Sequence, residues 1–124
     1  MTNALGRADF DVIASWVAPG HRVLDLGCGN GALLRHLIDS RQVVGWGVEI
    51  DKSDVLAAIR NGISVIQRNL EDGLRDFADQ SFDHVVLSRT LQTVRHTEDI
   101  LREMLRVGRE AVVSFPNFAC WKNL

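Results

Sequence analysis

Short apolar runs alternate with amphipathic segments along this chain, and the two kinds of segment predict different elements. Runs rich in Val, Ile and Leu have the length of single strands. They cover residues 22–26, 43–48, 64–66, 84–87 and 111–115. Between them, apolar side chains recur at three- and four-residue intervals, which indicates one buried face of a helix. The predicted helical segments are residues 8–17, 32–40, those between Asp51 and Asn61, a turn over 71–77 and a helix from Thr97 onward.

Strands that are apolar on both faces and separated by helices predict a parallel sheet with helices on both sides. With right-handed crossovers, five such strands form a doubly wound, Rossmann-like α/β domain. Ligands of these sheets bind beyond the carboxyl ends of the strands. The turns after the first four strands are therefore the expected place of a binding site.

Composition agrees with one domain over residues 1–124. The chain has 46% hydrophobic and 24% charged residues, a mixture that excludes a chain disordered throughout. Its formal net charge is −2, so it has no basic surplus for binding a nucleic acid. Its apolar runs fall far short of the ~20 residues of a membrane span, and its first residues lack the layout of a signal peptide. We expect neither a nucleic-acid partner nor a membrane.

The two cysteines, Cys28 and Cys120, allow at most one disulfide. A domain of this size does not need one, so we interpret both as free thiols in a reducing cytoplasm. The four histidines have no metal-ligand spacing with one another or with the cysteines. No metal site is predicted.

The turn after the first strand combines an acid with three glycines, Gly27, Gly29 and Gly31. The glycines let the backbone bend tightly and come close to a ligand. The helix that follows offers N–H groups and a partial positive charge, which suit a carboxylate or a phosphate. Asp25, at the strand tip, would repel a pyrophosphate but attract an ammonium group. A ligand with an ammonium and a carboxylate is an amino acid, and S-adenosylmethionine (SAM) carries its methionine in that form.

A dinucleotide site remains an alternative. The segment from Gly27 to Ala32 also fits the Gly-x-Gly-x-x-Gly/Ala pattern, and Glu49 stands about 20 positions after Gly29, where NAD-binding proteins carry an acid. The pattern by itself leaves NAD open, and Asp25 favours SAM.

Polar residues also follow the next strands. Glu49 can accept hydrogen bonds from both hydroxyls of a ribose, and it would disfavour the 2′-phosphate of NADP. Asp51 is better explained as a helix cap. Asn69 offers a donor and an acceptor to an adenine edge, or else forms a turn. The predicted cofactor-binding residues are Asp25, Gly27, Cys28, Gly29, Gly31, Glu49, Ile50, Asn69, Leu70 and Ser88.

No catalytic residue is predicted. Residues 88–92 follow the fourth strand, where an acceptor substrate would bind, and they contain no Asn-Pro-Pro-Tyr-like segment and no acid–base pair. His96 is a lone histidine. A helix N-terminus could lower the pKa of the Cys28 thiol, but no partner base accompanies it.

Several segments together resemble one family, the methionine biosynthesis protein MetW family, within the class I SAM-dependent methyltransferases. The resemblance covers nearly the whole chain. Its most specific parts are the segment Leu101–Gly108 and the segment Val113–Phe118. The other matching segments are Arg22–Gly31, Gly47–Asp51, Gly62–Gln67, Gln80–Asp83 and Leu91–Gln92.

The resemblance implies a bacterial cytoplasmic protein that works with homoserine O-acetyltransferase in methionine synthesis, with no established methyl acceptor. It also implies that SAM or S-adenosylhomocysteine binds at Asp25, at the three glycines and at Glu49. Two departures bear on the adenine contact and on an acceptor or partner surface. Arg68 and Asn69 stand where the family has Gly-Asp, and Arg89 stands where the family has Gln.

Class I methyltransferases add a sixth and a seventh strand beside strand five, whereas this sequence ends at Leu124. We therefore expect both strands to be missing and the edge of strand five to be exposed. Either the sequence is a fragment, or a partner or a second copy covers that edge. An accessory protein is favoured, because no catalytic groups are recognised. An active methyltransferase on a small-molecule acceptor stays open, since methyl transfer needs mainly in-line placement. An NAD-binding domain is the third hypothesis for the function of the chain.

Overall fold

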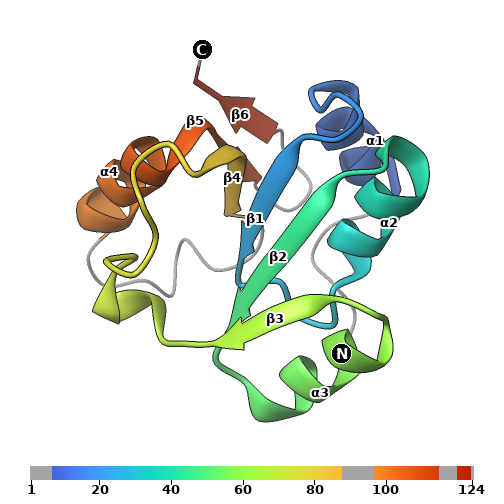
Figure 1. Cartoon of the computed structure of the whole chain (residues 1–124), viewed down its shortest axis with the longest axis horizontal. Helices are drawn as coiled ribbons and strands as arrows, with labels where there is room; N and C mark the ends of the chain where they lie inside the picture. Colours follow the sequence, from blue (N-terminus) through green and yellow to red (C-terminus); the bar gives the residue numbers. More distant parts are fainter. Residues whose placement is uncertain (1–6, 88–96, 115–119, 124) are drawn as a thin grey trace.

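In the computed structural model, which describes residues 7–87, 97–114 and 120–123, the chain forms one six-stranded sheet with helices on both faces (Figure 1). The helices are α1 (Arg7–Ser15), α2 (Ala32–Arg41), α3 (Lys52–Arg60) and α4 (Thr97–Val107), with a short 3₁₀ helix η1 (Leu70–Asp72). The strands are β1 (Arg22–Leu26), β2 (Val44–Glu49), β3 (Ser64–Gln67), β4 (Phe82–Leu87), β5 (Gly108–Ser114) and β6 (Cys120–Lys122).

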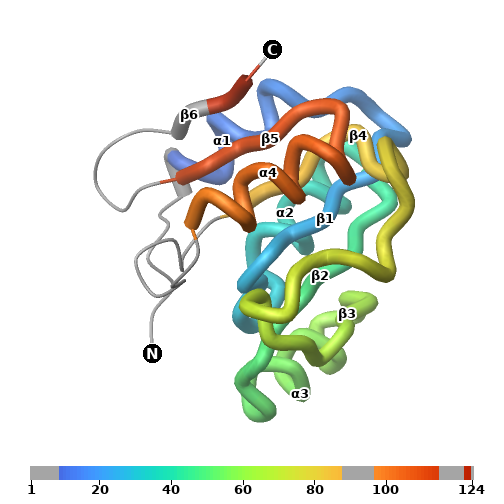
Figure 2. Tube along the Cα trace, turned by 90° about the vertical axis from the view of Figure 1, so that its left-hand side faces the viewer, coloured from blue at the N-terminus to red at the C-terminus, as the bar shows by residue number. Residues whose placement is uncertain are grey.

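The strands lie in the order β3-β2-β1-β4-β5-β6, and the first five run parallel to one another. The two views agree that β3 and α3 lie at one end of the molecule and β6 at the other (Figures 1 and 2). The order of the strands in the sheet reverses between β1 and β4, and this position is the switch point of a doubly wound sheet. The predicted fold class is confirmed.

Alternation along each strand sends side chains into two separate cores. On β1, Val23 points to the core beneath α1 and α2, while Leu24 and Leu26 point to the core beneath α4. All three side chains are fully buried. Each such burial contributes on the order of 2 kcal/mol, so both faces of β1 stabilise the sheet.

Two predicted boundaries differ from the structure by three residues or more. Strand β5 begins at Gly108, directly after α4, and not at residue 111. The helical turn predicted over residues 71–77 is wrong beyond Asp72, because Gly73 adopts a left-handed φ of 76°. The guanidinium of Arg106 then donates hydrogen bonds to the carbonyl oxygens of Leu74 and Phe77, at 2.8 Å each, so the part of the crossover after η1 is held to α4 without forming an α-helix.

The prediction of an open β5 edge is also wrong. Strand β6 pairs antiparallel with β5, and Lys122 lies opposite Val112. Beyond the strand, Asn123 exchanges two hydrogen bonds with the backbone of Ala111. The edge is thus covered from Ala111 to Ser114, which removes this stretch as a basis for self-association.

Helices cover both faces of the sheet less completely than the pattern predicts. The side chains of Val44 and Trp46 on β2 remain 53% and 40% exposed. Gly45 and Gly47 of the same strand face α2 and the loop before it, so by alternation Val44 and Trp46 point to the opposite side. On that side α4 packs on β4 and β5.

None of the helices within the described residues has the length and apolar character that a membrane crossing requires. Among these residues there is also no group of three or more His, Cys, Asp or Glu arranged to hold a metal ion.

Two histidines distant in the sequence meet in the structure. The Nδ1 atom of His21 lies 2.8 Å from the Nε2 atom of His84, and His84 also contacts Glu110. The sequence gives no sign of this contact.

Candidate functional site

The turn between β1 and α2, residues 27–31, is here called the glycine loop. Gly27, Gly29 and Gly31 have φ angles of 73°, 57° and 83°. Side chains rarely tolerate this left-handed region, so the local bend requires glycine at these positions. At Gly31 the space is also limited, because a Cβ atom would lie 2.6 Å from Cγ1 of Ile63.

Several neighbours hold the glycine loop in place. The N–H groups of Gly27 and Cys28 both donate to the carbonyl oxygen of Val48, at 2.7 and 3.0 Å. The side-chain amide of Asn61 donates to the carbonyl oxygen of Asn30 at 2.9 Å. The loop is thereby fixed to β2 and to the end of α3 before any ligand arrives. The sequence suggests Asn61 only as a helix terminus, so its contact with the loop was not predicted.

Glu49, at the carboxyl end of β2, is bound to the glycine loop. One carboxylate oxygen accepts a hydrogen bond from the Gly29 N–H at 2.8 Å, and the other accepts from the N–H groups of Ile50 and Asp51 at 3.1 and 3.0 Å. The side chain is only 8% exposed. A carboxylate offers roughly four acceptor positions, so this arrangement leaves room for about one more hydrogen bond. Asp51 acts as the helix cap that was predicted, since it accepts from the Asp54 N–H.

Asp25 lies in the centre of the sheet, between Gly47 of β2 and Val86 of β4. Its side chain is fully buried and shares a face with Val23, beneath α1 and α2. Together with Glu49 it places two carboxylates beside the glycine loop. This end of the sheet is therefore electronegative next to a helix N-terminus, an arrangement that suits a ligand with both charges.

Cys28 is a core residue of the loop. The residue is 2% exposed, and its Sγ donates to the carbonyl oxygen of Gly29 at 3.6 Å. Burial, followed by the charges of Asp25 and Glu49, raises the pKa of the Cys28 thiol above its usual range. The suggestion that a helix N-terminus lowers this pKa is thus wrong, and the thiol is a neutral packing group. Any contact with a ligand would come from its backbone.

Gly47 also shapes the site, because a Cβ atom there would lie 2.5 Å from Sγ and 2.9 Å from Cβ of Cys28. Replacing Gly47 by alanine should lower the free energy of unfolding by about 1–3 kcal/mol, since overpacking pushes the glycine loop away from β2. Urea denaturation measures this loss. Cys28→Ala should relieve part of it in the double variant. Gly45→Ala is the matched control, since its nearest neighbour is the flexible end of Leu34 at 3.0 Å. Equal losses at both positions would contradict this account.

At the carboxyl ends of β2 and β3, a hollow of about 450 Å³ brings together two predicted residues, Ile50 and Asn69. Ile50 is 57% exposed and offers an apolar surface. The Oδ1 atom of Asn69 accepts a hydrogen bond from the Glu71 N–H at 3.0 Å. This contact is the one expected if Asn69 forms a turn. The remaining lining residues are Gln67, Arg68, Asp72, Arg75 and Asp76.

Two further predicted binding residues are Leu70 and Ser88. Leu70 packs its side chain against the core beneath α4 and does not line this hollow. Ser88, together with Arg89, Gln92 and His96, lies outside the described residues.

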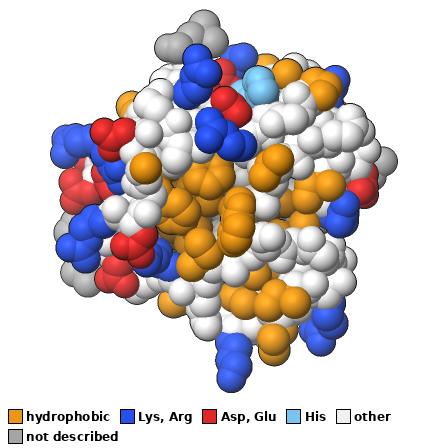
Figure 3. Space-filling model, viewed as in Figure 1, with side chains coloured by type: hydrophobic (Ala, Val, Ile, Leu, Met, Phe, Trp, Pro, Cys, Tyr) orange, Lys and Arg blue, Asp and Glu red, His pale blue; other side chains and the backbone are white. Residues whose placement is uncertain are grey.

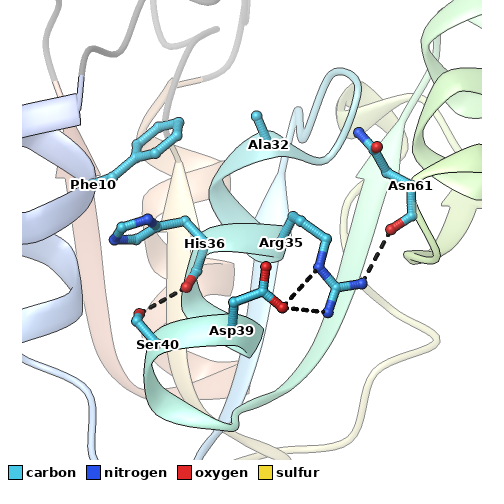
Figure 4. Close-up of a pocket in the computed structure, with 7 residues that line it drawn as sticks. All are labelled: Phe10, Ala32, Arg35, His36, Asp39, Ser40 and Asn61. Carbon is cyan, nitrogen blue, oxygen red and sulfur yellow. Dashed lines mark hydrogen bonds and ion pairs between the residues drawn. The ribbon is translucent and has the colours of Figure 1, made fainter.

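A second hollow, of about 490 Å³, lies on the outer side of α2 (Figure 4). Its central side chain, Arg35, donates to the carboxylate of Asp39 and to the carbonyl oxygen of Asn61. These contacts tie α2 to the end of α3. None of the predicted binding residues that the structure describes lines this hollow, and it does not lie at the strand ends where ligands of such sheets bind.

A parallel sheet with this strand order, an antiparallel strand beside β5, a glycine loop after β1 and an acid at the end of β2 together give the arrangement of a class I methyltransferase-like domain. The chain belongs to the MetW family, because the family model "Methionine biosynthesis protein MetW" matches residues 7–124. The family resemblance seen in the sequence is confirmed.

Among curated proteins, the chain is 44% identical over 119 residues to the bifunctional methionine biosynthesis protein MetXA/MetW of Rhodopirellula baltica. This match covers 90% of the chain and 19% of the relative. The chain is 32% identical over 120 residues to the ubiquinone/menaquinone biosynthesis C-methyltransferase UbiE of Ectopseudomonas mendocina, covering 86% of the chain and 46% of the enzyme. It thus spans less than half the length of either relative.

Among solved structures, a SAM-dependent methyltransferase from Thiobacillus denitrificans in complex with S-adenosyl-L-homocysteine superposes with a TM-score of 0.76. The two chains share 15% sequence identity, over 91% of this chain and 50% of the other. At 15% sequence identity, this structural similarity shows only that the two chains share a fold.

Proposed function

We propose that this chain binds SAM or S-adenosylhomocysteine at the carboxyl ends of β1, β2 and β3. The observation that carries the proposal is the hydrogen bond of 2.8 Å from Gly29 N–H to the Glu49 carboxylate, which joins the glycine loop to the acid of β2. In this proposal Asp25 pairs with the ammonium group of the methionine moiety, and the loop backbone with the start of α2 receives its carboxylate.

The residues of the site fit the remaining parts of the cofactor. Glu49 has acceptor capacity for a ribose hydroxyl. The hollow with Ile50 and Asn69 offers an apolar surface and an amide beside it, which suit an adenine ring. Leu70 and Cys28 would contribute their backbone, and Ser88 completes the proposed set.

We further propose that the chain acts as an accessory partner of homoserine O-acetyltransferase in methionine synthesis, and we infer a cytoplasmic location from that role. Support comes from the Rhodopirellula baltica relative, whose name joins MetXA and MetW in one bifunctional protein. Since SAM is made from methionine, a SAM-binding partner could report on the supply of the product.

An active methyltransferase on a small-molecule acceptor is the second candidate. The relative named as a C-methyltransferase, at 32% identity, favours it. Methyl transfer gains most of its rate from placing acceptor and methyl group in line, so a recognisable base is not required.

Calorimetry and co-purification separate these possibilities. We expect binding heat with SAM and with S-adenosylhomocysteine, and none with NAD. The chain should co-purify with homoserine O-acetyltransferase and change its rate. No heat with either sulfur ligand at millimolar concentration would overturn the cofactor assignment. If the chain changes neither the rate nor the elution of the acetyltransferase, the accessory role fails and the methyltransferase function remains as the candidate.

A further inference from the structure

An apolar and basic surface lies on the sheet away from the proposed cofactor site. Val44 and Trp46 of β2 are 53% and 40% exposed on the face opposite α2. Figure 3 shows apolar side chains gathered across the middle of the face on which β1 and β2 are seen in Figure 1. An exposed tryptophan beside a second apolar side chain is a common anchor of a protein interface.

Basic side chains border these apolar residues along the amino-terminal ends of the strands. Arg22 of β1 lies opposite Val44. Its side chain is 50% exposed, and that of Arg109 on β5 is 70% exposed. Both guanidinium groups lie near a single carboxylate, that of Asp83, at 3.7 and 3.9 Å. Two cations therefore share one anion at the amino-terminal edge of this face, where Arg22 adjoins Val44 and Arg109 lies two strands beyond Arg22, on β5.

We propose that Val44, Trp46, Arg22 and Arg109, here called the Trp46 surface, dock a partner protein that presents an apolar side chain flanked by carboxylates. Charge complementarity selects this partner. A second copy of the chain, approaching with the same surface, would bring guanidinium groups toward one another. The inference rests on the proposed accessory role, in which the partner is the acetyltransferase.

The position of the Trp46 surface leaves the cofactor site open to ligand. Glu49 lies three residues after Trp46 on β2, about 10 Å farther along the strand, and its side chain points to the opposite face. A partner on the Trp46 surface and SAM at the strand ends can thus bind at the same time. β2 connects the two sites.

The test measures the affinity of the chain for homoserine O-acetyltransferase by biolayer interferometry. Trp46→Ala should weaken binding by at least about 30-fold, as expected for a tryptophan anchor. Val44→Lys, at a more exposed position, is a second variant that should also weaken binding. Arg22→Glu combined with Arg109→Glu should weaken binding and abolish its dependence on salt. Leu105→Ala, at an apolar residue 47% exposed on α4, is the matched control and should bind as the wild type does.

Each outcome decides between the two proposals. If the wild type binds and the Trp46 and Val44 variants bind equally well, the docking inference is overturned and the accessory role stands. If the wild type does not bind, the accessory role fails and the docking inference fails with it, while SAM binding is judged by calorimetry. If sedimentation shows a dimer of the chain that Trp46→Ala dissociates, the occupant is a second copy and the acidic partner is excluded.

Discussion

Replacing Glu49 by alanine should remove roughly 3 kcal/mol of folding free energy and abolish measurable SAM binding. The carboxylate accepts three backbone N–H groups, and the one from Gly29 is buried. A buried donor left without an acceptor costs about 1–3 kcal/mol, and the more accessible N–H groups of Ile50 and Asp51 cost less because water can reach them. The glycine loop would also lose one of its hydrogen bonds to β2, while those from Gly27 and Cys28 to Val48 remain. Urea denaturation measures the first effect and calorimetry the second.

Two further variants separate the structural role of Glu49 from its role toward the ligand. Glu49→Gln keeps one acceptor oxygen and replaces the other by a donor, so its stability should fall between those of the wild type and Glu49→Ala. Asp51→Ala removes a neighbouring acid that only caps α3. It should cost about 1 kcal/mol and leave SAM affinity within about two-fold. A Glu49→Ala protein as stable as the wild type would contradict the loop-anchor role.

Much of the fold could be predicted because its signals are local. Helix α3 shows this most clearly. Asp51 caps its start, and Asn61 is followed by Gly62 with a φ of 77°, so both ends are marked in the sequence. The apolar stripe of α2 likewise predicts its buried side chains, Leu33, Leu34 and Leu37.

The elements that were missed depend on partners distant in the sequence. Strand β6 is three residues long and has no period to detect, and it forms only because β5 offers an edge. The crossover after β3 is held by Arg106, which lies about 30 residues later, so a helical pattern over residues 71–77 is overridden by tertiary contacts.

The candidate site divides in the same way. Asp25, the glycines and Glu49 could be selected from their positions at predicted strand ends. The contacts that make them one site could not, since they join β1 to β2 and α3. The close approach of Gly47 to Cys28 and the bond from Asn61 to Asn30 are examples. The raised pKa of the Cys28 thiol could not be predicted, because the helix N-terminus is visible in the sequence, whereas the burial and the two nearby carboxylates are not.

The charge of Asp25 gives the sharpest test of ligand identity. Asp25→Asn preserves the size of this fully buried side chain and removes its negative charge. Because a buried charge pair loses about 2–5 kcal/mol when one partner is removed, SAM affinity should fall by at least about 30-fold. Calorimetry measures this change. Thermal denaturation is the control for folding, and Asn should keep the melting temperature closer to that of the wild type than Ala, which also leaves a cavity.

NAD predicts the opposite sign for the same substitution. A carboxylate at this position repels a pyrophosphate, so Asp25→Asn should bind NAD equally well or more tightly if the glycine loop holds a dinucleotide. The two ligands therefore respond to one neutralised charge in opposite directions. Unchanged SAM affinity in a folded Asp25→Asn protein would show that Asp25 does not recognise the ammonium group, so the role proposed for Asp25 would be overturned while SAM binding itself would stand.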